Sequence, residues 1–173
     1  MDQFGPAQIA ALLVLAQRGL EELYSQRNTR RLLAEGGREA GRDFYPVVAV
    51  THLAWIASLF LLVPAGAVAS IALLILYLAL QIVRYWVINS LGHYWTHRIV
   101  TLDNAPVVGA GPYRLLRHPN YWVTIAETFL LPAVFGAYAL GAVMGAVWTA
   151  VIAYKIKLED AALAARRPTI PSP

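Results

Sequence analysis

The sequence predicts an all-α integral membrane protein with about five transmembrane helices, of which the last two form a hairpin. Hydrophobic residues make up 58% of the 173 residues and charged residues only 14%, whereas soluble domains contain about 45–50% and about 25%. Several apolar segments approach the roughly 20 residues that a helix needs to cross a bilayer. Basic residues gather between these segments, as loop charges do in membrane proteins. We therefore expect one membrane domain over residues 1–173.

The first segment, residues 5–24, has the weakest transmembrane signal. It is apolar at its start but contains Gln17, Arg18, Glu21 and Glu22. We expect a short span that continues as a polar helix into water. A helix lying in the membrane interface is the alternative.

The next three elements are clearer. Residues 44–63 and 67–88 are nearly continuous apolar runs, and the second run carries Gln81 and Arg84 near its end. The stretch 121–154 is too long for one span. Because Pro132 and Gly136 interrupt it, it predicts a helical hairpin that turns near residues 135–138. Small residues in its second half (Gly141, Ala142, Gly145 and Ala146) predict close packing against a neighbouring helix.

The charges of the loops predict the orientation. The turn at residues 63–66 and the turn near Gly136 carry no charge, whereas the stretch 25–43, the loop 89–120 and the C-terminal tail are rich in basic residues. Under the positive-inside rule the charged loops face the cytoplasm. We therefore expect a multi-pass protein of the cell (inner) membrane whose long loop lies on the cytoplasmic side, with the N-terminus outside if the first segment spans.

The most distinctive sequence is GPYRLLRHPNYW at residues 111–122. Pro119 suits the first turn of the following helix, whose free N–H groups and positive dipole end favour an anionic group beside His118. Two arginines, Arg114 and Arg117, lie in the same motif. The alternative interpretation is a basic loop that binds anionic lipid headgroups.

Two further sets of polar residues are candidates for function. Glu127 lies about two turns past Pro119, and a carboxylate inside the membrane is a functional candidate by default; a structural partner for Arg84 is the alternative. If the last helix continues past the bilayer, Glu159 and Asp160 reach the level of the loop. The alternative for Glu159 is a surface pair with Lys155, four residues earlier.

Metal binding is not expected. The chain has no cysteine, so cysteine-based metal sites and disulfides are excluded. His93 and His97 could bind a metal from one helix face, but no glutamate completes an HExxH pattern. The neighbouring Tyr94 and Trp95 favour an aromatic belt at the membrane surface.

Together, VVGAGPYRLLRHPNYW, a helical hairpin and YKIKLEDAAL resemble the isoprenylcysteine carboxyl methyltransferase family. The pattern of that family is GPYRYxRHPxY, a hairpin of two spans and a final R-I-x-x-E-E helix. The resemblance covers Asn89 to about Ala165. It divides the domain into membrane scaffold helices, residues 1–88, and a catalytic core, residues 89–165. In the final motif Lys155 stands for arginine and Asp160 for the second glutamate.

The resemblance implies S-adenosylmethionine as methyl donor, bound in the cytoplasmic loop beneath the last helix. The matching cofactor-binding positions are Gly111, Tyr113, His118, Pro119, Tyr121 and Glu159. The expected catalytic residues are Arg117, Glu127 and Arg114. Arg117 would orient the acceptor oxygen and stabilise its anion, and Glu127 or a histidine would be the base if one is required.

The resemblance also implies the substrate class. The acceptor is an oxygen, of a carboxylate or of an enol or phenol, on a lipophilic molecule in the membrane. The sequence looks most similar to the bacterial branch that O-methylates lipophilic polyketides such as alkylpyrones. Phospholipid N-methyltransferases share the motif and remain an alternative, as do an NADPH-dependent reductase of the steroid 5α-reductase type, a membrane scaffold and a small transporter.

Overall fold

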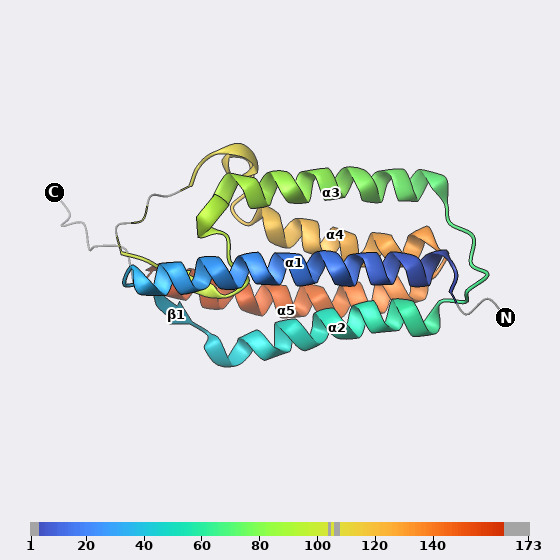
Figure 1. Cartoon of the computed structure of the whole chain (residues 1–173), viewed down its shortest axis with the longest axis horizontal. Coiled ribbons are helices and arrows are strands. Elements are labelled where there is room, and N and C mark those ends of the chain that lie inside the picture. Colours follow the sequence, from blue (N-terminus) through green and yellow to red (C-terminus); the bar gives the residue numbers. More distant parts are fainter. Residues whose placement is uncertain (1–3, 104, 106–107, 165–173) are drawn as a thin grey trace.

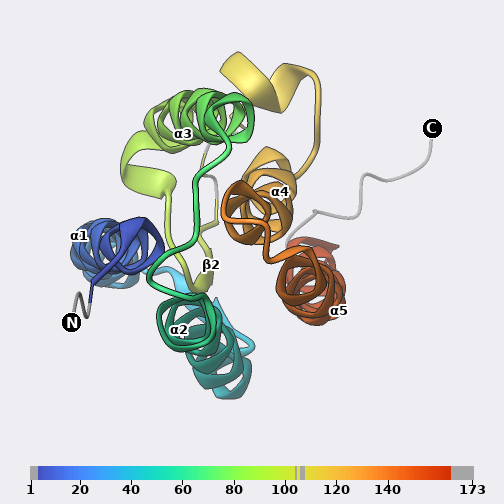
Figure 2. The same ribbon diagram turned by 90° about the vertical axis from the view of Figure 1, so that its right-hand side faces the viewer.

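The computed structural model describes residues 4–103, 105 and 108–164, and most of these residues are helical. Five long helices lie side by side along one axis: α1 (Pro6–Ala34), α2 (Tyr45–Leu62), α3 (Ile71–Leu91), α4 (Pro119–Val134) and α5 (Tyr138–Ala164). Viewed along this axis, α4 lies between α3 and α5, while α1 lies next to α2 (Figure 2). The predicted helical bundle is thereby confirmed.

Among the described residues, three helical segments are long and apolar enough to cross a membrane: Arg42–Leu62, Ile71–Tyr94 and Tyr138–Ala164. Helix α4 has only 16 residues, slightly fewer than the shortest usual span of about 17. Helix α1 carries charged residues from Arg18 onward. The chain is therefore a membrane protein, and a total of five spans stays a prediction.

The predicted hairpin is confirmed. Helices α4 and α5 are joined by three residues, of which Gly136 has a φ of +73° that favours glycine. A Cβ atom added to Gly141 would lie 2.8 Å from the carbonyl oxygen of Phe129, and one added to Gly145 would overlap the Phe129 ring. The small residues of α5 therefore let the two helices approach closely.

The two uncharged turns lie together at one end of the bundle (Figure 1). The amide of Gln8 donates to the carbonyls of Phe60 (3.0 Å) and Val63 (2.7 Å), and the N–H of Ser70 donates to the carbonyl of Val134 (2.8 Å). These bonds satisfy carbonyl groups at helix ends that have no partner within their own helix. They tie α1 to α2, and the start of α3 to α4, without any charged side chain.

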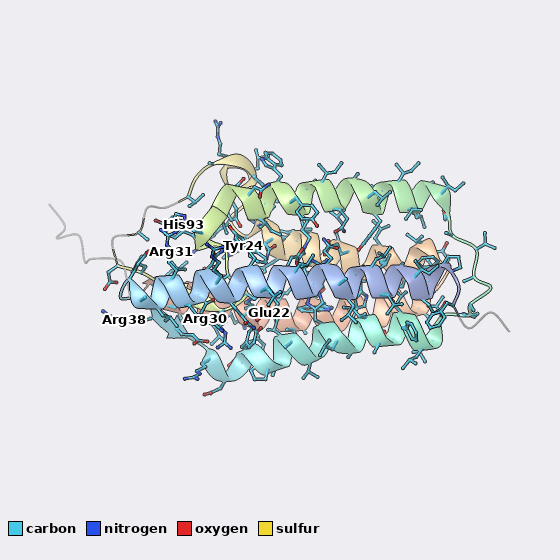
Figure 3. All side chains as sticks on the ribbon, in the orientation of Figure 1. Glu22, Tyr24, Arg30, Arg31, Arg38 and His93 are labelled. Atoms are coloured by element: carbon cyan, nitrogen blue, oxygen red, sulfur yellow. The ribbon has the colours of Figure 1, made fainter. Side chains whose placement is uncertain are left out.

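The opposite end, where Arg31 and Arg38 lie (Figure 3), contains structure that the sequence analysis assigned to loops. Strands β1 (Arg38–Ala40) and β2 (Ile99–Thr101) form an antiparallel pair in which Glu39 lies opposite Val100. Three short 3₁₀ turns accompany it: η1 (Arg42–Phe44), η2 (Gly92–Tyr94) and η3 (Gly111–Arg114). Three-residue strands are too short to show an alternating pattern, so the sequence did not predict them.

The structure also changes the interpretation of His93 and His97. Helix α3 ends at Leu91, so the two histidines do not lie on one helix face. The Nδ1 atom of His97 lies 2.8 Å from a carboxylate oxygen of Glu22, and burial lowers the pKa of His97. Within the described part of the chain, no group of three or more His, Cys, Asp or Glu side chains could hold a metal ion.

The middle of the bundle contains a buried ion cluster made of Arg18, Glu21, Arg84 and Glu127. Arg18 contacts carboxylate oxygens of Glu21 and Glu127, each at 2.7 Å. Arg84 contacts the same two carboxylates at 2.6 and 3.1 Å. Two positive and two negative charges from α1, α3 and α4 are thus paired. The contact between Glu127 and Arg84 that the alternative interpretation expects is present.

Removal of one member of this cluster is expected to destabilise the fold. Glu127→Ala leaves two buried arginines to share one carboxylate, which costs about 3 kcal/mol or more of unfolding free energy. We expect a clear loss of stability when the variant is unfolded in mixed detergent micelles. Glu35→Ala, which removes an exposed ion pair with Arg31, is the control and should change little. Equal stability of the two variants would show that the cluster is dispensable.

The orientation gives a second prediction. Because the chain has no cysteine, single cysteines at Val68 and Glu35 report the two ends of the bundle, and both positions are exposed. In intact cells an impermeant maleimide should label Val68→Cys, whereas Glu35→Cys should react only after the cells are opened. The reverse pattern would invert the proposed orientation.

Candidate functional site

The GPYRLLRHPNYW motif folds as a turn followed by the first turns of α4. Gly111 has a φ of +57°, and a Cβ atom there would lie 3.1 Å from Trp86 Nε1 and would clash with Ser90. Glycine therefore allows η3 to pack directly on α3. Pro119 is the first residue of α4, as predicted, and is buried.

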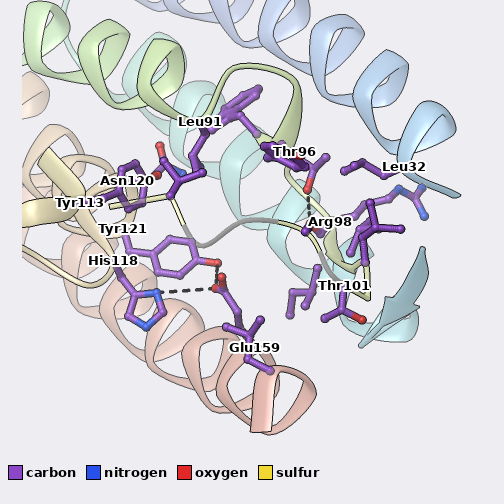
Figure 4. A pocket seen from close by; sticks show the side chains of 18 of the residues that line it. Leu32, Leu91, Thr96, Arg98, Thr101, Tyr113, His118, Asn120, Tyr121 and Glu159 are labelled. Atoms are coloured by element: carbon purple, nitrogen blue, oxygen red, sulfur yellow. Dashed lines mark hydrogen bonds and ion pairs between the residues drawn. The ribbon is translucent and has the colours of Figure 1, made fainter. Parts of the chain in front are cut away.

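The motif meets the last turns of α5. The hydroxyl of Tyr121 donates to Glu159 over 2.6 Å, and His118 Nδ1 lies 3.8 Å from the same carboxylate oxygen. The rings of His118 and Tyr121 are stacked with their centroids 5.5 Å apart. These three side chains converge in Figure 4. The expectation that Glu159 lies level with the loop is confirmed.

The neighbouring acid contacts the same loop. Asp160 lies 2.9 Å from Arg117 and 3.6 Å from Nε2 of His118. Glu159 and Asp160 therefore face adjacent parts of the motif, so α5 and the loop are joined by two acids rather than one.

The contacts of Lys155 differ from the surface pair with Glu159 that the sequence analysis considered as an alternative. It is buried, and its Nζ atom donates to the carbonyl oxygen of His97 over 2.7 Å. The same atom lies 5.2 Å from the centroid of the Tyr121 ring, within the range of a cation–π contact. Lys155 thus links α5 both to the segment after α3 and to the motif.

These elements surround a cavity of about 610 Å³, a size typical of small-molecule sites. Its lining comes from Leu32 of α1, most of the segment 94–102, the motif, and Glu159 and Leu163 of α5. Polar side chains of the motif and α5 form one part of the wall. Apolar residues such as Leu32, Ile99, Val100 and Leu102 form another.

The structure brings five of the predicted site residues to the cavity and leaves four elsewhere. Those that line it are Tyr113, Arg117, His118, Tyr121 and Glu159. Gly111 and Pro119 support the loop from outside the lining, and Arg114 is exposed on the surface. Glu127 lies deeper, in the ion cluster.

Burial also sets the protonation state of one lining residue. It raises the pKa of the Tyr113 phenol, and the negative charge of Glu159 raises it further. Tyr113 therefore stays protonated at neutral pH and can donate a hydrogen bond into the cavity.

Two lining residues were missed by the sequence analysis. Asn120 Oδ1 and Trp95 Nε1 are buried, and neither has a hydrogen-bond partner among the described residues. Buried polar atoms are nearly always paired, so these atoms indicate positions where a ligand would supply the partner. Asn120 stood inside the motif without a role assigned to it, and Trp95 was assigned to the aromatic belt.

Comparison with known proteins agrees with this geometry. The model of the isoprenylcysteine carboxyl methyltransferase (ICMT) family matches residues 71–165, which include the motif, the hairpin and Glu159. The resemblance seen in the sequence is thereby confirmed. No solved structure matches the chain.

Two curated relatives are similar over most of their length. The chain is 32% identical over 157 residues to the uncharacterized protein YpbQ of Bacillus subtilis, covering 87% of this chain and 92% of the relative. It is 24% identical over 156 residues to an uncharacterized protein of Haemophilus influenzae, covering 87% and 90%.

The position of Lys155 gives a prediction about the integrity of the site. Lys155→Met removes the charged hydrogen bond to His97 and leaves a carbonyl without its partner, which costs about 1.5–3 kcal/mol. We expect a lower free energy of unfolding in mixed micelles. Lys157→Met, an exposed position on the same helix, is the matched control. A loss no greater than that of the control would mean that the link from α5 to His97 adds nothing to stability.

Proposed function

This chain belongs to the isoprenylcysteine carboxyl methyltransferase family, and from this premise we propose that it transfers a methyl group from S-adenosylmethionine to an oxygen of a lipophilic acceptor. Family membership supports a membrane methyltransferase that acts on a lipophilic substrate. The donor, the reacting atom and the cytoplasmic position of the site are our proposal.

One observation carries the proposal. The motif and the end of α5, about 40 residues apart in sequence, line one cavity that contains buried polar atoms without partners. Other buried polar atoms of the described residues, such as Trp55 Nε1 and Tyr77 Oη, also lack partners, but Asn120 and Trp95 line a cavity in which a ligand can supply them. The cavity therefore fits a ligand that has both polar groups and flat apolar surface, as a nucleoside-linked methyl donor has.

The residues present fit this donor. Glu159 offers a carboxylate for its ammonium or ribose groups, while the N-terminus of α4 suits its carboxylate. Asn120 and Trp95 offer an acceptor and a donor whose partners are missing. When bound, S-adenosylmethionine supplies an electrophilic methyl group on a sulfonium.

Methyl transfer then needs little chemistry from the protein beyond alignment. A bond forms between the acceptor oxygen and the methyl carbon, and the electron pair of the breaking carbon–sulfur bond stays on sulfur. Alignment of the reactants can lower such a barrier by about 7–11 kcal/mol. A carboxylate acceptor needs no base, whereas an enol or phenol must also release its proton.

Among the proposed catalytic residues, the geometry favours Arg117. Its side chain lines the cavity, is 64% exposed and is oriented by Asp160. A guanidinium at this place would attract and stabilise an anionic acceptor oxygen, which supports an O-methyl acceptor. Glu127 accepts hydrogen bonds from Arg18, Gln81 and Arg84 and does not line the cavity, so we propose that it is structural.

The proposal predicts donor-dependent methylation of a lipid-soluble product. The purified protein in lipid vesicles, given methyl-labelled S-adenosylmethionine and a lipid extract of the source cells, should transfer label into the organic phase. His118→Ala and Glu159→Gln should each weaken donor binding about 10- to 100-fold in calorimetry, because a hydrogen bond to a charged group is worth about 1.5–3 kcal/mol. Lys157→Met should bind normally.

Arg117→Lys separates catalysis from binding. It keeps the positive charge but loses the planar fork of the guanidinium, so we expect turnover to fall more than donor affinity. Unchanged donor affinity in both the His118 and Glu159 variants would exclude the proposed pocket. NADPH oxidation with the lipid extract, without any transfer of the methyl label, would favour the reductase alternative.

A further inference from the structure

Two neighbouring leucines protrude from the surface in the middle of the motif. Leu115 is 79% exposed and Leu116 is 48% exposed. They lie between Arg114 and Arg117, which are also exposed, and neither leucine lines the cavity. The cavity therefore does not explain why two large apolar side chains stand here.

The surface beside them is continuous with the apolar face of α3. Ile75, Leu78 and Ile82 are exposed along that face, and Tyr85 and Trp86 extend it toward the end of the helix. These positions follow the i, i+3, i+4 spacing of one helix face. Because α3 is one of the three candidate spans, this face contacts lipid.

The turn η3 rests on the end of this face. Gly111 packs against Trp86 and Ser90, and the two views place the turn on the outer side of α3, away from the bundle axis (Figures 1 and 2). Leu115 and Leu116 follow the turn, and both of their N–H groups donate to the carbonyl of Pro112, at 3.1 and 3.0 Å. The backbone of the turn is therefore held by hydrogen bonds although the leucine side chains are exposed.

The position along the bundle matches the membrane boundary. Ser90 lies about 28 Å along α3 from Ile71 at about 1.5 Å per residue, close to the thickness of the hydrocarbon core, about 30 Å. Exposed aromatic rings mark the same level, since Tyr85 and Trp86 end the α3 face and Trp122, 60% exposed, begins α4. Such rings concentrate at membrane–water boundaries.

We propose that residues 114–117, Arg-Leu-Leu-Arg, form a membrane-inserted loop. The side chains of Leu115 and Leu116 enter the acyl boundary of the leaflet, and Arg114 and Arg117 lie at the level of the lipid phosphates. Apolar side chains flanked by arginines are suited to this boundary because the guanidinium groups reach the headgroups while their stems stay in the apolar layer. The partner of this surface is the lipid leaflet itself.

Insertion places one wall of the cavity at the leaflet. The inserted loop contains one lining residue, Arg117, and is flanked directly by two others, Tyr113 and His118. A lipid-resident acceptor would then meet Arg117 at the depth where its own polar head lies. This consequence rests on the proposed function, whereas the insertion does not.

Site-directed spin labelling tests the insertion, because a chain without cysteine can carry one label at a chosen place. Single cysteines at Leu115 and Leu116 are labelled in vesicles of phosphatidylcholine and phosphatidylglycerol. The accessibility of each label to oxygen, which concentrates in lipid, is compared with its accessibility to an aqueous nickel chelate. Ile82→Cys is the lipid-facing control and Glu35→Cys the aqueous control.

We expect the label at Leu115 to resemble the one at Ile82, with an oxygen-to-nickel ratio several-fold above that at Glu35. A ratio like that of Glu35 would place the loop in water and overturn the proposal. Low accessibility to both reagents would mean that protein, such as a second copy of this chain, covers the leucines, and would also overturn it.

A double variant, Leu115→Ser with Leu116→Ser, separates insertion from function. It should keep donor affinity in detergent but lose several-fold in methyl transfer to a lipid acceptor in vesicles. If the labels at Leu115 and Leu116 are exposed to lipid but the protein transfers no methyl group, the insertion is supported and the proposed function is rejected. If the labels show insertion but the double variant transfers methyl groups as well as the original protein, insertion does not contribute to methyl transfer.

Discussion

The buried ion cluster is the interaction on which the rest of the bundle depends. Arg18, Glu21, Arg84 and Glu127 are almost fully buried, and each arginine contacts both carboxylates. No single charge could stay there alone, because an unpaired charge in an apolar interior is very costly. The cluster therefore fixes the relative rotation and depth of α1, α3 and α4. Since Gly111 of the motif packs on Trp86 and Ser90 of α3 and the motif continues into α4, those two helices set where it lies.

The segment after α3 is held from both sides. Asn28 of α1 donates to the carbonyl of Trp95 over 2.8 Å, and the hydroxyl of Ser25 accepts from the N–H of His97 over 2.7 Å. Lys155 of α5 donates to the carbonyl of the same histidine. One wall of the cavity is thus tied to the first helix and to the last. The site draws on α1 directly, through Leu32, so residues 1–88 do more than surround a separate core.

The sequence predicted the elements whose signals are local. Long apolar runs predicted α2, α3 and the hairpin, and Pro119 predicted the start of α4. The sequence could not assign partners to buried charges, because Arg18 and Glu127 are 109 positions apart and only the fold brings them together. For the same reason it left open whether Glu127 serves chemistry or structure. The strand pair was missed because each strand has only three residues. Trp95 was assigned to the aromatic belt because of its neighbours in the sequence. Only the structure shows that it lines the cavity and that its N–H has no partner among the described residues.

The structure also explains how the chain tolerates its two departures from the family pattern. Lys155 replaces an arginine, but its observed contacts are one carbonyl and one aromatic face, and a single ammonium can serve both without a planar fork. Asp160 replaces a glutamate and is one methylene shorter, yet it still reaches Arg117 at 2.9 Å. Both acids of α5 lie near His118, but Glu159 also accepts from Tyr121 whereas Asp160 also pairs with Arg117. On the proposed function this difference separates the residues that would hold the donor from the arginine that would orient the acceptor. Because both sets are fixed by the same two turns of α5, the donor and the acceptor would be aligned by one rigid element.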